Sequence, residues 1–160
     1  MPETKETFRK RLFAPGGKPL SEIAAGAEET LERSSAKIGV HLKGELSRLE
    51  AETSRLSNAP KVSRDELLAL SESVSALLGL AGMARETALC EGLKSLSCLV
   101  ESVLEHEEAQ WPSHALFAAA LAAHSQYCRK IQTHSEEAND TAQEVLDHLE
   151  RMNAKILGAL

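Results

Sequence analysis

The sequence has few aromatic and few β-branched apolar residues. Its 160 residues include three Phe, one Trp and one Tyr, too few to line a deep apolar pocket or to stack against several bases. Six Val and four Ile stand against 24 Leu, 23 Ala and 21 Glu. Unbranched side chains favour helices because they lose little rotamer freedom there. The composition therefore excludes an all-β protein or a Rossmann-type enzyme and predicts an all-α fold.

Acidic residues outnumber basic ones, and long apolar runs are scarce. The net charge is −6, which repels nucleic-acid phosphates and anionic lipids at long range. No apolar run approaches the roughly 20 residues of a membrane span, and the first residues lack the apolar stretch of a secretory signal. The three cysteines form no C-x-x-C pair, as is usual for reduced thiols in the cytosol. We therefore expect a cytoplasmic protein that binds neither nucleic acid nor a membrane.

The start of the chain is basic, unlike the rest of it. Residues 1–19 contain five Lys or Arg against two Glu and end in Pro15-Gly16-Gly17-Lys18-Pro19. This pattern predicts a flexible basic arm over 1–19, either a solvated tail or a docking peptide for an acidic partner. The remaining residues, 20–160, are expected to form one helix-bundle domain.

Apolar residues recur every three or four positions after the arm, which predicts amphipathic helices. The first is expected over about 21–56, with a bend or a close helix contact near 39–44, where two glycines lie. Ser63 and Glu66 have the spacing of a capping box that starts a second helix. A break near 83–87 should let Thr87 cap the third helix.

The last helices are separated less clearly. Pro112 is expected as the first residue of the fourth helix. The apolar period lapses over 134–140, and Thr141 begins another capping-box spacing, so the chain ends in a fifth helix or in a bent continuation of the fourth. Short antiparallel connections would give an up-down helix bundle. The inner face of the fourth helix is predicted to hold Leu116, Ala119, Ala120, Ala123, Tyr127 and Ile131.

No residue pattern indicates a metal site, a cofactor or a catalytic centre. His124 and Cys128 share a helix face but supply two ligands at most, so ordinary packing or exposure is the simpler interpretation. Cys90 and Cys98 are interpreted as small core residues. An exposed helix His followed three residues later by Lys would suit phosphotransfer, and His41-Leu42-Lys43-Gly44 comes closest. Its Lys is one residue too near, which turns the cation by about 100° around the helix.

One segment of the second helix resembles a known motif. Ser75-Ala76-Leu77-Leu78-Gly79-Leu80-Ala81-Gly82-Met83 is similar to the core of histidine-containing phosphotransfer (Hpt) domains, which reads H-x-x-K-G. With Gly79 on the motif glycine, Ser75 stands where the phospho-accepting His belongs and Leu78 where the Lys belongs. The resemblance covers about 65–121 and extends to Hpt-like proteins of bacterial chemotaxis that have lost the histidine.

The resemblance implies a bundle without phosphotransfer, because serine cannot replace imidazole as acceptor and donor and leucine supplies no cation. What it retains is a partner-binding face that contains Ser71, Ser75, Leu78, Gly79 and Gly82. We expect a non-enzymatic adaptor for a response-regulator receiver domain or a histidine kinase. Three alternatives stay open: the two glycines serve only close helix packing, the protein is an assembly scaffold or homodimer, or an unrecognised histidine transfers phosphate.

Overall fold

The computed structural model describes residues 20–133 and 139–158, so the predicted arm over 1–19 lies outside the described residues. The chain divides into two compact units, Met1–Ala36 and Lys37–Leu160. The second unit begins later than the domain expected from the sequence. The described part contains no strand, which confirms the predicted all-α fold. Its elements are α2 (Leu20–Asn58), α3 (Arg64–Ala84), α4 (Thr87–Leu104), the short 3-10 helix η1 (Glu108–Gln110), α5 (His114–Thr133) and α6 (Asn139–Leu157).

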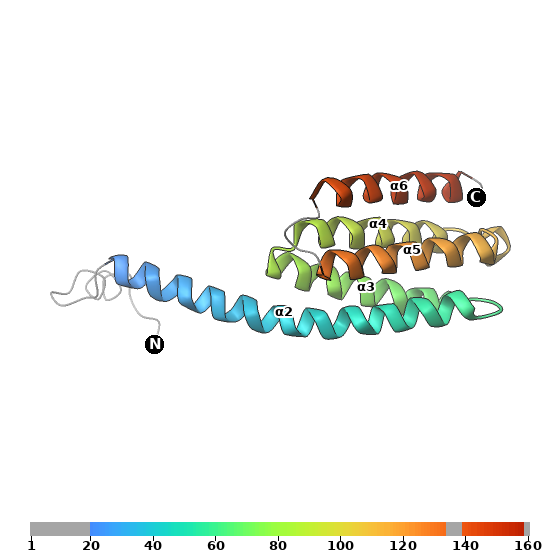
Figure 1. The fold of residues 1–160 in the computed structure, drawn as a ribbon. Coiled ribbons are helices and arrows are strands. Elements are labelled where there is room, and N and C mark those ends of the chain that lie inside the picture. The colour runs from blue at the N-terminus through green and yellow to red at the C-terminus, as the bar shows by residue number, and fades with distance from the viewer. Residues whose placement is uncertain (1–19, 134–138, 159–160) are drawn as a thin grey trace, which may run out of the picture. The chain divides into compact units, whose positions relative to one another are not determined.

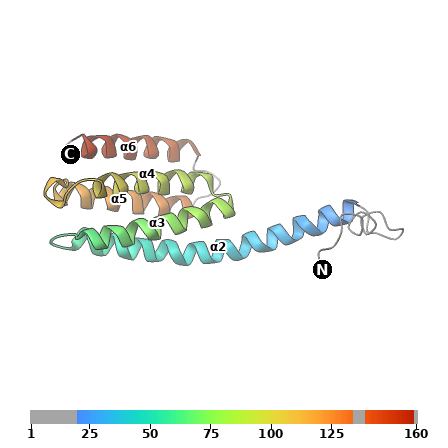
Figure 2. The ribbon, with the colours of Figure 1, turned by 180° about the vertical axis from the view of Figure 1, so that it is seen from behind.

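Within 37–160 the helices form a bundle in which α4 is central. Helix α4 packs against α3, α5 and α6, and α6 also packs against α5. In both views of the ribbon the chain reverses direction from one helix to the next (Figures 1 and 2). Helices α5 and α6 pack against each other, so the last helix folds back on the fourth. Residues 134–138, which make up most of the predicted lapse in the apolar period, lie outside the described residues.

The core is built mainly from leucines at the helical period. Burying each such side chain contributes about 1.5–3 kcal/mol relative to exposure. The one polar side chain among the largest fully buried ones is a histidine on α5. The set consists of Leu49, Leu56, Leu67, Leu70, Val74, Leu89, Leu93, Leu96, Leu99, Leu121, His124 and Leu149.

The start of α3 is fixed by the capping box that the sequence predicts. The backbone N–H of Glu66 donates to Ser63 Oγ at 3.3 Å, and the Ser63 N–H donates to Glu66 Oε2 at 3.0 Å. Arg55, at the end of α2, binds the same carboxylate at 2.6 Å and, with the Ser63 bonds, lowers the pKa of Glu66 to about 2. This corner therefore joins α2 to α3.

Replacing Ser63 with alanine should lower the free energy of unfolding by about 1 kcal/mol, because the Glu66 N–H then loses its side-chain acceptor. Urea unfolding followed by circular dichroism measures the change. Ser54→Ala, on the exposed side of α2, is the matched control and should leave stability within about 0.5 kcal/mol of the wild type. Equal midpoints for the two variants would contradict the cap.

Other helix ends differ from the expectation. Glu86, not Thr87, is the N-cap residue of α4, and it forms no side-chain cap bond. Arg85 closes α3 in the left-handed region at φ 61°, so the break needs no cap from Thr87. Helix α5 begins at His114 because the Ser113 carbonyl accepts its first bonds; Pro112 lies in the preceding connection. Helix α6 begins before Thr141.

The predicted inner face of α5 was wrong by one residue. Leu116 is 54% exposed and Ala119 is exposed, whereas Phe117 and Leu121 are buried. One residue corresponds to about 100° around a helix. Alanines occupy both sides of this part of the helix, so the sequence does not distinguish the buried side from the exposed side. Ala120, Tyr127 and Ile131 are buried as predicted, and Ala123 is half-buried.

Two further expectations are corrected. A Cβ added at Gly39 or Gly44 would meet nothing within 4 Å, so these glycines do not mark a close helix contact. Cys98 is exposed and Cys90 only half-buried, so the core assignment is wrong for Cys98. Cys128 is the buried cysteine, and burial raises its pKa to about 12, which makes it an unreactive packing residue.

Candidate functional site

The five predicted partner-binding residues lie along one side of α3. Ser75, Gly79 and Gly82 are exposed, and Ser71 and Leu78 are half-buried beside them. A Cβ added at Gly79 or Gly82 would meet nothing within 4 Å. The interpretation that these glycines serve close helix packing is therefore wrong. They leave a shallow surface that a partner can approach closely.

Two large apolar side chains belong to the same surface and were missed from the sequence. Leu68 is 46% exposed and Met83 58% exposed. Both project from the exposed side of α3, one near each end. We define the α3 outer face as Leu68, Ser71, Ser75, Leu78, Gly79, Gly82 and Met83. Between Leu67 and Ala84 the helix carries a single charged residue, Glu72.

This composition makes α3 the one described helix that is long and apolar enough to cross a membrane, judged by length and composition alone. The sequence offers no uninterrupted apolar run of this length, because Glu72 and the serines at 71, 73 and 75 interrupt it. In the bundle α3 buries Leu67, Leu70, Val74, Leu77 and Ala81 in the core. Core packing accounts for that side of the helix and leaves its apolar outer face unexplained.

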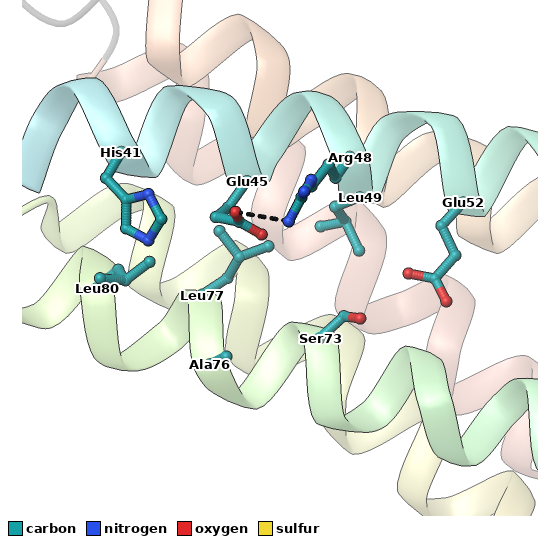
Figure 3. A pocket seen from close by; sticks show the side chains of 9 residues that line it. All are labelled: His41, Glu45, Arg48, Leu49, Glu52, Ser73, Ala76, Leu77 and Leu80. Carbon is teal, nitrogen blue, oxygen red and sulfur yellow. Dashed lines mark hydrogen bonds and ion pairs between the residues drawn. The ribbon is translucent and has the colours of Figure 1, made fainter.

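A groove of about 420 Å³ lies beside this face, between α2 and α3 (Figure 3). Helix α2 contributes most of its polar side chains, and α3 contributes mainly apolar ones. Ala76 is exposed and adjoins the outer-face residues Ser75 and Gly79, so groove and face are continuous. The lining residues are His41, Glu45, Arg48, Leu49, Glu52, Ser73, Ala76, Leu77 and Leu80.

The polar side chains of the groove are unevenly partnered. Arg48 Nη1 donates to Glu45 Oε1 at 3.0 Å. The Glu52 carboxylate and the Ser73 hydroxyl lie at one end, where neither forms a hydrogen bond or ion pair with a described residue (Figure 3). His41 lies at the other end.

A second polar cluster lies in the core and joins α4, α5 and α6. His124 Nδ1 lies 2.8 Å from the Ala120 carbonyl, which can only accept, so Nδ1 carries the proton. Nε2 then accepts from Ser95 Oγ at 3.0 Å. Asn153 Nδ2 donates to Ser95 Oγ at 3.0 Å and to the Ser95 carbonyl at 3.1 Å.

The cluster combines a serine, a histidine and an amide, as hydrolase active sites do, but a substrate has no access to it from solvent. His124 is fully buried, and Ser95 and Asn153 are buried with it. Burial lowers the pKa of His124 and keeps the imidazole neutral. Substrate cannot reach the Ser95 hydroxyl, so the cluster holds three helices together rather than performing catalysis.

Metal binding finds no support in the described residues. They contain no group of three or more His, Cys, Asp or Glu side chains that could hold an ion. His124 and Cys128, which share a helix face, are both buried in the core. Packing therefore explains this pair, as the simpler interpretation of the sequence has it.

Comparisons with protein-family models, with curated proteins and with solved structures give no match. The α3 outer face and the adjoining groove are the features of the described residues that point to a function.

Proposed function

We propose that the protein is a non-enzymatic adaptor that binds a response-regulator receiver domain through the α3 outer face. The observation that carries the proposal is the exposure of an apolar, nearly uncharged helix face with two glycines open to solvent. Exposed apolar surface of this kind marks sites of protein interaction. The choice of a receiver domain follows from the Hpt resemblance, which lies on the same residues.

Such an adaptor would act by competing for the receiver rather than by chemistry. Ser75 offers a hydroxyl in place of imidazole, and Leu78 offers no positive charge for phosphoryl oxygens. The net charge of −6 does not favour approach to an acidic receiver pocket. The contact is therefore expected to be led by Leu68, Met83 and the glycine surface, with a weak dependence on salt.

Replacing Gly79 with arginine should reduce receiver affinity at least about tenfold, or 1.4 kcal/mol. The long charged side chain would stand in the middle of the face and hold the partner away. Arginine has a higher helix propensity than glycine, so the variant should unfold at the wild-type temperature or above it. Calorimetric titration against the receiver domains of the host, with and without a phosphoryl mimic, measures the affinity.

Gly44→Arg is the matched control, since Gly44 is also an exposed helical glycine with open space around it, but on α2. It should leave receiver affinity unchanged. Sedimentation of the free protein tests self-association, since a second copy could cover the same apolar face. A dimer abolished by Gly79→Arg, with no receiver bound, would replace the adaptor by a homo-oligomeric scaffold.

A further inference from the structure

The groove between α2 and α3 has an apolar floor and one acidic end. Leu49 and Leu77 lie in its lining and are almost completely buried, so only a thin apolar strip is offered to a ligand. Glu52 from α2 and Ser73 from α3 lie at the end of this strip (Figure 3). The combination suits a side chain with an aliphatic stem and a polar head.

The charge at the acidic end of the groove determines which polar end group a bound side chain can carry. Arg48 is one helical turn before Glu52, but its guanidinium binds Glu45 instead. That pair is neutral as a unit and leaves the Glu52 charge uncompensated among the described residues. A carboxylate with a neighbouring hydroxyl accepts hydrogen bonds from an ammonium or guanidinium group. An anionic or purely apolar head would leave Glu52 unpaired or desolvated.

We propose that this groove takes a lysine or arginine side chain of the protein that docks on the α3 outer face. Its stem would lie over Leu77, and its cation would bind Glu52 and Ser73. Ala76 connects the groove to the outer face, so one partner can occupy both. The identity of the partner rests on the proposed function, whereas the recognition of a cationic side chain does not.

The test uses small probes and therefore needs no partner. N-acetyl-lysine methylamide and N-acetyl-arginine methylamide are titrated into the full-length ¹⁵N-labelled protein, with N-acetyl-norleucine methylamide as the uncharged control. At least one cationic probe should shift the amide signals of Glu52, Ser73 and Leu77 and saturate in the millimolar range. The uncharged probe should not saturate. Shifts that are equal for all three probes, or that lie elsewhere, would overturn the proposal.

Glu52→Gln keeps the side-chain shape and removes the charge. It should weaken binding of the cationic probe at least about fivefold, because a charge-assisted bond becomes a neutral one. Glu144→Gln, an exposed charge on α6, is the matched control and should not change binding. Equal affinity in the Glu52→Gln variant and the wild type would contradict the site.

The two proposals can fail separately. Probe binding at Glu52 with no receiver bound would support the groove and reject the receiver adaptor. Receiver binding that is sensitive to Gly79→Arg, without probe binding and without an effect of Glu52→Gln, would support the adaptor and reject the groove.

Discussion

Replacing Gly92 with alanine should destabilise the bundle by about 1–3 kcal/mol, although alanine is the better helix former. Gly92 is buried in the first half of α4 and faces Tyr127 of α5. An added Cβ would lie 2.5 Å from Tyr127 Cδ1 and also too close to Cε1. The tyrosine ring is buried, and its hydroxyl donates to the Ala88 carbonyl at 3.2 Å, so the ring cannot move without losing contacts.

Gly79→Ala provides a control of opposite sign. The same methyl group at Gly79 meets nothing within 4 Å, so only the gain in helix propensity remains, up to about 1 kcal/mol. Urea midpoints of the two variants should therefore move in opposite directions from that of the wild type. The double variant Gly92→Ala/Tyr127→Leu should lose less stability than the two single changes added together. Additive losses would show that the ring does not limit this position.

The glycines illustrate what the sequence could not show. Gly79 and Gly92 both lie within apolar helices and look alike in the sequence, yet one is open to solvent and the other adjoins a buried ring. The difference comes from the packing of α4 against α5, which is a tertiary property. The sequence drew attention to Gly79 through a motif and gave no local signal for Gly92.

The capping box at Ser63 was predicted correctly, whereas the helix starts expected at Thr87, Pro112 and Thr141 were not. The Ser63 capping box depends on four consecutive residues, and the structure confirms it. The inner face of α5 depends on contrast between apolar and polar positions, and its alanines supply little. The outer face of α3 was found only in part: serines made the helix look amphipathic, so Leu68 and Met83 were not expected to be exposed.

The groove and the core polar cluster were missed for a different reason. Glu52 and Ser73 come from separate helices, and Ser95, His124 and Asn153 from three. No spacing along the chain connects them. A buried histidine could have been suspected only from its position on the correct inner face of α5, and the prediction placed that face one residue away.

Lowering the pH should destabilise the folded protein, because the buried His124 takes up a proton less readily than it does in the unfolded chain. Its pKa is lowered in the folded state, chiefly by burial, from an ordinary value of 6.5. Below that ordinary value the unfolded chain takes up a proton that the folded chain does not. The free energy of unfolding therefore falls as the pH drops below about 6.5 and stops falling below the lowered folded pKa. Protonation would also place an N–H against the Ser95 hydroxyl, where Nε2 is now an acceptor.

His124→Gln isolates this contribution, because glutamine keeps an acceptor for Ser95 and does not titrate. At pH 7.5 the variant should be less stable than the wild type by about 1–3 kcal/mol, since it loses buried hydrogen bonds and packing. The deficit should shrink as the pH is lowered to 5, where only the wild type loses stability through this side chain. Urea unfolding at several pH values measures both trends. A deficit that stays constant from pH 7.5 to 5 would mean that His124 titrates alike in the folded and unfolded chains, and that the buried cluster does not hold it neutral.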